Sequence, residues 1–421
     1  MDFKRFYRYD FASTRILIDQ VTKYYGIAIS AQILSYTPTS VVQLLHETKK
    51  PFFIDPMTFV FARDIDNICR NNKIRKSYQK LIEDYGEPFT NCASGTGLTP
   101  SQFKKGDGEF DLSLINKVCR NLLSYQTKKF GVAADFTKYN KLLKKGISSR
   151  GISPSFLVAP YFYANQYGDD YYKLSLTFAQ ESKKIKGSFD LYPVICISKE
   201  ILWNEPQIVN LVKDYVDFDG YMIWIDSLDE ETIIPQQLIG LKSLIEKLSA
   251  YRKPIYFMYG GFLCDLLSKF GLSGYSSGIC YGEKRSVDAV GGGAGNRYYI
   301  PFVHLKISED LANAFFARSN KNKSLMCTCP ICSKIHNYLP PSLDSQTYSG
   351  RFFSEMDFLD YRRHFLNVKY EEMTDIETMT NAQINLKLDS DIQKLIDIDR
   401  FPGQPSELDS RHLRLWKILF S

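Results

Sequence analysis

Short apolar segments that alternate with helical segments are the feature of this sequence that most limits its fold. Segments such as LYPVICIS and GYMIWID are almost continuously apolar, and each is followed by a stretch with helical periodicity. Strands of this kind are buried on both faces, as in a parallel sheet covered by helices. Eight segments are candidate strands, most of them followed by a helix, and 274–280 is a weak one: 27–34, 51–57, 155–163, 191–198, 220–226, 253–260, 274–280 and 298–307.

Eight strand–helix units over about 300 residues predict an α/β fold of the closed (β/α)8 TIM-barrel type. An open, doubly wound sheet is the alternative. The alternation stops after residue 308, where a cysteine cluster, a proline-containing loop and further helical segments follow. We therefore expect a barrel over 1–308 and a zinc-braced C-terminal helical appendage over 309–421, packed on the barrel.

The composition limits the cellular setting. The N-terminal segment has no apolar signal core, and no run approaches the length of a membrane span, so we expect no secretory address and no membrane partner. Nine cysteines without a paired framework fit a reducing cytoplasm. A formal net charge of +6 is compatible with a nucleic-acid partner without requiring one.

The motif CTCPIC places Cys327, Cys329 and Cys332 within six residues. Thiolates at this spacing suit a tetrahedral Zn²⁺ ion, which prefers four soft or borderline ligands. Two histidines could supply the fourth ligand: His336, four residues past Cys332, or His364 in the helical run DFLDYRRHFLNVKYEEM. Reduced thiols without a metal are the alternative. Three thiolates and a histidine would complete the coordination sphere, so the zinc would be structural.

A barrel followed by Cys-x-Cys-x-x-Cys and a later histidine resembles the tRNA-guanine transglycosylase family and its DNA-modifying 7-deazaguanine relatives. By that resemblance the fourth zinc ligand is His364, in HFLNVKYEEM. FFIDPMTFVF is similar to a family strand ending in Asp-Ser-Gly-Gly-Phe, which puts Asp55 at the aspartate. LYPVICIS and DFDGYMIWIDS resemble the strands that recognise the base. KPIYFMYGGFLCDLLSKFGLSGY, with Gly260 and Gly261, resembles the strand and helix before the nucleophile, which implies substrate contacts for this glycine pair.

The family's nucleophilic aspartate has no counterpart in this sequence, because SGYSSGICYGEKR carries no aspartate near Cys280. Asp55 and Asp226 each end a predicted strand, where barrel enzymes place their catalytic groups. They are the candidate catalytic pair, and Asp288, close to Arg285, could belong to the same site. A turn cap at Asp55 and a helix N-cap at Asp226 are the alternatives.

The run VGGGAGNRYY (290–299) is the most glycine-dense in the chain. Glycines let a backbone approach a phosphate or a base closely, so Gly292, Asn296 and Arg297 are candidate substrate-binding residues. The run is not a P-loop, because it lacks the Gly-Lys-Ser/Thr ending. A strand rather than a helix follows it, which excludes a dinucleotide fingerprint. A loop without a ligand is the alternative.

One main functional hypothesis and two alternatives follow. The resemblance implies a glycosyltransferase that exchanges guanine or 7-deazaguanine bases in nucleic acid, with DNA favoured over tRNA. The first alternative is a barrel without catalysis that serves as a nucleic-acid-binding or scaffold subunit, with other subunits of a DNA-modification or defence system as partners. The second is glycosidic cleavage by water, which releases the free base. In each case we expect a cytoplasmic protein that binds zinc.

Overall fold

The central feature of the fold is a curved sheet of parallel strands. The computed structural model describes residues 3–62, 68–71, 73–130, 152–279, 283–288, 295–400 and 408–420. Seven strands pair in the order β3-β2-β1-β11-β10-β9-β8, and every pair is parallel. Their bounds are β1 Lys4–Arg8, β2 Gly26–Ser30, β3 Phe52–Asp55, β8 Val194–Ser198, β9 Tyr221–Asp226, β10 Ile255–Phe257 and β11 Gly274–Gly278.

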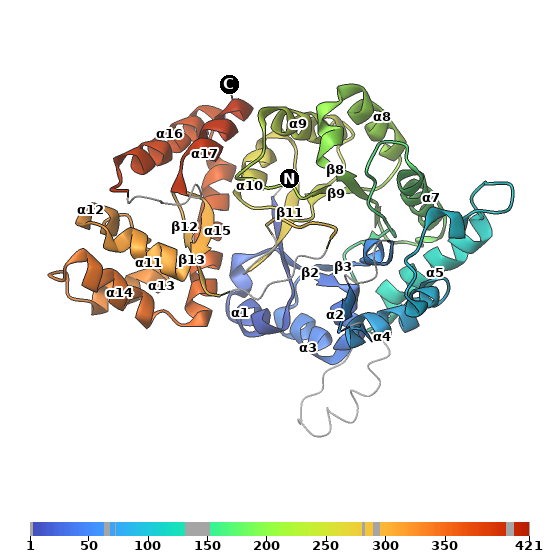
Figure 1. Ribbon diagram of the computed structural model, residues 1–421, viewed down its shortest axis with the longest axis horizontal. Helices are drawn as coiled ribbons and strands as arrows, with labels where there is room; N and C mark the ends of the chain where they lie inside the picture. The colour runs from blue at the N-terminus through green and yellow to red at the C-terminus, as the bar shows by residue number, and fades with distance from the viewer. Residues whose placement is uncertain are drawn as a thin grey trace, which may run out of the picture.

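An eighth strand, β6 (Leu157–Val158), closes this sheet into a ring. On one side β6 pairs in parallel with β7 (Leu191–Tyr192), which continues through Pro193 into β8. On the other side the backbone N–H of Ser155 donates to the carbonyl oxygen of Phe52 in β3, at 2.8 Å. The ring therefore runs β1-β2-β3-β6-β8-β9-β10-β11, and the predicted (β/α)8 barrel is confirmed (Figure 1).

The number of barrel strands was predicted correctly, but one member was wrong. The first strand of the barrel is KRFYR, Lys4–Arg8, which the sequence did not single out. The segment 298–307 lies outside the barrel, where β12 (Arg297–Ile300) and β13 (Leu305–Ser308) form an antiparallel hairpin. The charged residues at both ends of the first strand obscure its apolar pattern in the sequence. The hairpin, in contrast, is apolar because the C-terminal helices cover it.

Aromatic rings fill the interior of the barrel. Phe156 stacks on Tyr192 with ring centroids 4.2 Å apart, and its ring lies 5.8 Å from that of Tyr256. Phe6 meets Phe53 edge to face at 5.2 Å. All five side chains are buried. The interior is thus a packed core rather than a channel, as in other barrels of this type.

Helices surround the strands and start with side-chain caps where the sequence provides them. Asp111, Asp169 and Asn204 each accept a backbone N–H at the start of a helix, which satisfies donors that have no partner within the helix. The helices of the outer layer are α1 (Thr14–Asp19), α2 (Ala31–Tyr36), α3 (Pro38–Thr48), α4 (Lys76–Tyr85), α5 (Leu112–Lys128), α7 (Asp170–Ile185), α8 (Glu205–Tyr215), α9 (Pro235–Ser249) and α10 (Phe262–Leu267).

The C-terminal helices lie to one side of the barrel, in orange and red in Figure 1. Helix α15 packs against both parts, because it contacts α10 of the barrel and β12 of the hairpin. The division at residue 308 stays a prediction. Every helix in the described part of the chain is too short or too polar to span a lipid bilayer. The helices of this part are α11 (Glu309–Ala317), α12 (Asn320–Lys323), α13 (Pro330–Tyr338), α14 (Ser345–Glu355), α15 (Phe358–Thr378), α16 (Asn381–Asp397) and α17 (Arg411–Trp416).

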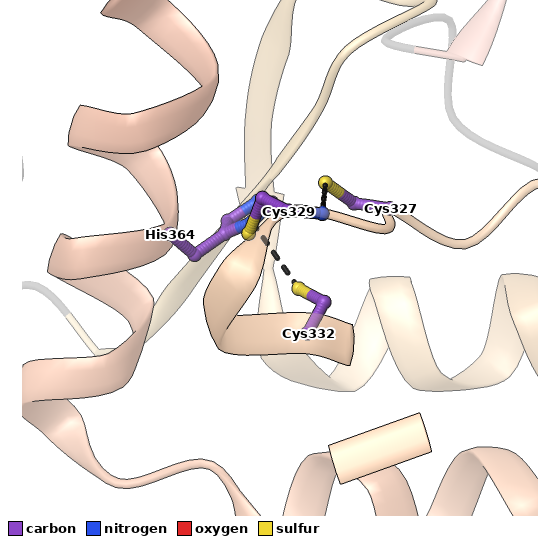
Figure 2. A group of neighbouring side chains, drawn as sticks. All are labelled: Cys327, Cys329, Cys332 and His364. Carbon is purple, nitrogen blue, oxygen red and sulfur yellow. Dashed lines mark hydrogen bonds between the residues drawn. The ribbon is translucent and has the colours of Figure 1, made fainter. Parts of the chain in front are cut away.

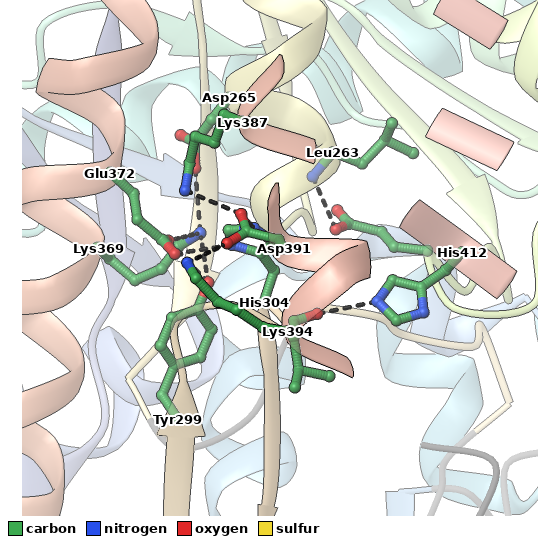
Figure 3. A network of polar contacts seen from close by, with 12 residues as sticks. Leu263, Asp265, Tyr299, His304, Lys369, Glu372, Lys387, Asp391, Lys394 and His412 are labelled. Carbon is green, nitrogen blue, oxygen red and sulfur yellow. Dashed lines mark hydrogen bonds and ion pairs between the residues drawn. The ribbon is translucent and has the colours of Figure 1, made fainter. Parts of the chain in front are cut away.

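A buried network of charged side chains joins α15 to the barrel and to α16 (Figure 3). Lys369 of α15 pairs with Asp265 of α10 at 3.0 Å and with Glu372 at 3.1 Å. The His304 ring lies between Glu372, 2.8 Å from Nδ1, and Asp391 of α16, 3.3 Å from Nε2. Charges removed from water are stable only when they are paired in this way, so the network fixes the placement of both helices.

Candidate metal centre and barrel mouth

The three cysteines of CTCPIC and His364 come together in one cluster (Figure 2). Their ligand atoms all lie within 4.8 Å of one another. The His364 Nδ1 atom is 3.4 Å from the sulfur of Cys329 and 3.3 Å from that of Cys332. Three of the four residues are buried, and Cys327 is partly buried. This is the donor set and the spacing that a tetrahedral Zn²⁺ ion requires.

The local sequence explains how the cluster forms. Cys329 is the N-cap of α13, and Pro330 occupies the first turn, where its missing N–H costs nothing. Cys332 follows within that turn, so the two thiols lie on the same side. His364 comes from α15, far along the chain. The cluster thus joins two helices of the C-terminal part.

The surroundings of His364 fix the orientation of its ring. Its Nε2 atom lies 2.8 Å from the carbonyl oxygen of Tyr299, and the Tyr298 ring stacks on it at 4.4 Å. Because a carbonyl oxygen can only accept, Nε2 carries a proton and donates it to Tyr299, which leaves Nδ1 facing the thiols. Metal-binding histidines are held by such a contact. The hydrogen bond from Cys327, then that from Cys332, also lowers the pKa of the Cys329 thiol well below its usual value.

His336, the other candidate for the fourth ligand, lies outside the cluster. The Tyr348 hydroxyl donates to its Nδ1 at 2.7 Å, and its Nε2 donates to the carbonyl oxygen of Cys327 at 2.9 Å. Both ring nitrogens therefore have partners within the protein. Of the two histidines that the sequence proposed, the geometry brings only His364 to the thiols.

Asp55 lies at the carboxyl end of β3, where the sequence placed it. Arg8 forms an ion pair with its Oδ2 atom at 2.5 Å. The Tyr161 hydroxyl donates to Oδ1 at 2.8 Å, and the backbone N–H of Met57 donates to the same atom at 3.0 Å. The carboxylate is fully buried. Asp55 therefore lies at the barrel mouth, as predicted, and its side chain also accepts a hydrogen bond within the turn at Met57.

Aromatic rings and arginines cover the mouth around Asp55. Trp224 lies 4.6 Å from the Phe59 ring and 5.0 Å from the Tyr259 ring. The Arg8 guanidinium stands 4.3 Å above Tyr259, whose hydroxyl accepts from Arg285 at 3.0 Å. Burial raises the pKa of the Tyr259 hydroxyl, although the positive charges of Arg285 and Arg8 act in the opposite direction. The centre of the mouth is therefore closed by aromatic side chains that pack against cations or against one another.

Asp226 ends β9 at the same end of the barrel, but it has partners of its own. Its Oδ1 atom accepts from the backbone N–H of Val287 at 2.6 Å, and Ser227 donates to Oδ2 at 3.1 Å. Among the described residues, no hydrogen bond or ion pair joins Asp226 to Asp55. The two carboxylates share the rim without forming a contact pair.

The other predicted site residues are dispersed. Asp288 is exposed, and its N–H donates to Ser286. The N–H of Gly260 donates to the Ser276 carbonyl at 3.2 Å, and that of Gly261 donates to Glu230 at 2.5 Å. The backbone N–H groups of both glycines therefore bind other residues of the protein.

Three described residues of the glycine-rich run, Gly295, Asn296 and Arg297, line a cavity of about 250 Å³ together with Asp10 and Lys306. Asn296 donates to Glu309 at 2.8 Å, and Arg297 donates to the carbonyl oxygen of Lys306 at 3.1 Å. Gly292 and Cys280 lie outside the described residues.

Several residues of the mouth were not predicted: Arg8, Tyr161, Tyr259 and the site contact of Arg285. Arg8 is the last residue of β1, and Asp55 is the last residue of β3. An arginine at the end of a strand with an alternating pattern could have been predicted to pair with an aspartate at the end of another strand. The two tyrosines carry no local signal, because tyrosines are frequent throughout the chain.

The sequence matches no family profile and no curated protein. Among solved structures, the intracellular xylanase TsXylA from Thermoanaerobacterium saccharolyticum JW/SL-YS485 is 8% identical, covers 68% of this chain and 86% of its own, and has a TM-score of 0.35. A mutant of that xylanase with xylotetraose is 9% identical with the same coverage and a TM-score of 0.36. CbXyn10B in native form is 12% identical, covers 66% of this chain and 85% of its own, and has a TM-score of 0.32.

These comparisons contradict the assignment to the tRNA-guanine transglycosylase family, which was wrong: no family profile matches, and the named structures include xylanases. The predicted exchange of guanine or 7-deazaguanine, the DNA or tRNA partner and the purine base are corrected with it. The nucleic-acid-binding or scaffold alternative, with further subunits of a modification system, has no support either. The physical reason is that a barrel hosts many chemistries. In addition, β11 ends at Gly278 without an acidic residue.

Proposed function

We propose that Cys327, Cys329, Cys332 and His364 bind a structural zinc ion. The observation that carries this proposal is the gathering of four ligand atoms within 4.8 Å, with Nδ1 of His364 turned towards the thiols by the Tyr299 contact. Four protein ligands leave no position for substrate or water, so the ion would hold helices together rather than take part in a reaction. A reducing, cytoplasmic environment suits this site, because the thiols must stay reduced to bind metal.

The test is the metal content of the purified chain and of matched variants. Wild type is expected to carry about one zinc ion per chain, and C332S and H364A are expected to lose it. C69S and H336A are the controls, because Cys69 and His336 lie outside the cluster. X-ray absorption should show three sulfur ligands and one nitrogen ligand. A chain that binds no zinc, or an H364A variant that retains it with the same ligand shell, would contradict the proposal.

A second candidate function is reaction at a glycosidic carbon, favoured by the carboxylate at the centre of the barrel mouth. Retaining glycosidases use one carboxylate as nucleophile and a second group for proton transfer. Asp55 lies where barrel enzymes hold catalytic groups, and Arg8 and Tyr161 orient it. Asp226, on the same rim, would donate the proton to the leaving oxygen. Because Asp55 is buried beneath the side chains that close the mouth, a substrate reaches it only when Tyr161 and its neighbours move.

In this reaction a carboxylate oxygen of Asp55 attacks the anomeric carbon while the bond to the leaving oxygen breaks. That oxygen takes the proton of Asp226. Water, deprotonated by Asp226, then attacks the same carbon and frees Asp55. The measurement is the intact mass after incubation with 2-deoxy-2-fluoro glycosides, together with turnover of aryl glycosides. A sugar adduct is expected in wild type and in D107N, an exposed control, but not in D55N. No adduct and no turnover with any glycoside would rule out this candidate.

A further inference from the structure

A large groove with a cationic lining lies beside the barrel mouth. Its volume is about 1670 Å³. The residues that line it belong to the connections that leave the carboxyl ends of β1, β2 and β3, which are the connections that form binding sites in barrels. We call it the basic groove and define it by Phe11, Tyr36, Arg70, Lys73, Arg75 and Lys76.

Four cations stand along the basic groove within a short part of the chain. Arg70 and Lys73 belong to the hairpin of β4 (Cys69–Arg70) and β5 (Lys73–Ile74), and Arg75 and Lys76 lead into α4. All four are exposed, and none forms an ion pair with a described residue. Glu83 is the single acidic residue among the described residues of the lining. Like charges held this close together repel one another, and an anion would relieve the repulsion.

The start of α4 adds to this positive potential. Arg75 is the N-cap and provides no side-chain cap, so backbone N–H groups of the first turn lack a side-chain acceptor. The helix has ten residues, and its dipole also places positive charge at this end. The guanidinium groups of Arg70 and Arg75 can bind a carboxylate, sulfate or phosphate through two parallel hydrogen bonds.

Two exposed aromatic rings distinguish the basic groove from a simple anion site. Phe11 is 54% exposed and Tyr36 is 48% exposed, although both are large apolar side chains. Flat rings at the edge of a groove are suitable for stacking on the apolar face of a sugar ring. The cations and the rings together match a ligand that is both ring-shaped and negatively charged.

We propose that the basic groove binds an anionic saccharide that carries carboxylate, sulfate or phosphate groups. The saccharide part rests on the proposed reaction at a glycosidic carbon, whereas the anionic part rests on the four cations alone. The basic groove would then select charged glycosides at the entrance to the barrel mouth. Neutral oligosaccharides would lack the groups that the cations bind.

The experiment measures binding by titration calorimetry to the full chain. The probes are an oligogalacturonate, a heparin-derived tetrasaccharide and glucose 1-phosphate, which separate the three anionic groups, with neutral xylotetraose and inorganic tripolyphosphate for comparison. At least one anionic saccharide is expected to bind and to bind less tightly as salt is added, because exposed charges are screened. Equal binding of xylotetraose would overturn the proposal, as would the absence of binding by all three anionic saccharides.

A pair of matched variants locates the binding. Replacement of Arg70, Lys73, Arg75 and Lys76 by Gln is expected to weaken binding about tenfold or more, since each tenfold step needs only about 1.4 kcal/mol. The control replaces the same number of exposed cations elsewhere and should bind as wild type does. Equal affinity of the two variants would overturn the proposal. The control set consists of Arg120, Arg351, Lys173 and Lys213, each changed to Gln.

The saccharide part has its own readout. F11A/Y36A should weaken binding of the saccharide but not of tripolyphosphate, whose chain has no ring to stack. If tripolyphosphate binds as tightly as the best saccharide and this variant changes neither affinity, the saccharide assignment is wrong. If the saccharide binds in the basic groove but no adduct forms on Asp55, the glycosidic reaction fails while the binding proposal stands.

Discussion

The Nε2 atom of His364 donates to the carbonyl oxygen of Tyr299 at 2.8 Å, which leaves Nδ1 to face Cys329 and Cys332. This contact ties α15 to β12 of the hairpin, while the thiols tie it to the start of α13. The orientation of one imidazole ring thus connects three elements that are distant in the sequence. A metal at this point would stabilise the C-terminal part as a unit.

Removal of the metal should therefore lower thermal stability, and a variant without the His364 ligand should not show this effect. We expect a strong chelator to lower the melting temperature of wild type to that of H364A, and to leave H364A unchanged. Binding free energy at a structural site of this kind is folding free energy, and in isolated zinc peptides it reaches roughly 10 kcal/mol. H336A should still respond to the chelator. Scanning calorimetry with and without chelator makes the comparison, and an H364A variant that responds like wild type would refute it.

The ion pair between Arg8 and Asp55 should be strongly coupled. The Asp55 carboxylate is fully buried and the Arg8 side chain is 12% exposed, so removal of one partner leaves a charge in a dry site. We expect R8M to cost roughly 3–5 kcal/mol of unfolding free energy. R8M/D55N should cost less than the sum of the single changes, as measured by chemical denaturation in a double-mutant cycle.

Arg15 provides the matched control for this cycle. It pairs with Asp19 at 3.7 Å on the surface, where its side chain is 74% exposed. Solvent and salt weaken such a pair, so R15M should cost at most about 1 kcal/mol. Additive costs of R8M and D55N would show that the buried ion pair contributes no coupling.

The architecture could be predicted because its signal is repeated along the chain. Strands such as Tyr221–Asp226 are buried at almost every position, and that pattern survives without knowledge of the neighbours. The first strand could not be found in this way, since the burial of Arg5 depends on Asp265, its ion-pair partner far along the chain. The hairpin was misassigned for the opposite reason: burial by helices gives β12 the same apolar pattern as a barrel strand.

The candidate site shows the same division between local and distant signals. The thiols of Cys327, Cys329 and Cys332 were predicted together because their spacing is local. The choice between His336 and His364 depended on how α15 packs, which spacing alone does not determine. At the barrel mouth, the contact of Tyr161 with Asp55 joins two different strand ends, so neither position indicated the other.

Gly240 should be intolerant of a side chain, because α9 approaches the segment before α8 closely. A Cβ atom at this position would overlap the carbonyl oxygen of Leu202, which is backbone and cannot rotate away. We expect G240A to destabilise the protein by about 1–3 kcal/mol. Gly350 in α14 is the control: no atom lies within 4 Å of its Cβ position, so G350A should stabilise by about 0.5–1 kcal/mol. Denaturant midpoints distinguish the two, and equal shifts would contradict the close approach.

His412 should make stability depend on pH between about 6.5 and 4. Burial lowers the pKa of its imidazole from 6.5 to about 4, although the hydrogen bond to the carbonyl oxygen of Val303 acts to raise it. The unfolded chain therefore takes up this proton first, so the stabilisation is complete above pH 6.5 and is lost as the pH falls towards 4. H412Q should remove roughly 3 kcal/mol of the loss in unfolding free energy that wild type shows over this pH range. An unchanged slope in urea denaturation over this range would contradict the assignment.

Glu372 should act in a lower and separate pH range. Burial alone would raise the pKa of its carboxyl, but the charges of Lys369 and then His304 lower it from 4.5 to about 2. The stabilisation is therefore present above pH 4.5 and is lost as the pH falls through about 2, because the unfolded chain binds the proton first. E372Q should be less stable than wild type at pH 7, since Lys369 loses a charged partner. It should also lose less stability than wild type between pH 4.5 and 2, and it should keep the slope that belongs to His412. Parallel profiles of E372Q and wild type below pH 4.5, measured by urea denaturation, would show that the carboxyl is not held ionised by this network.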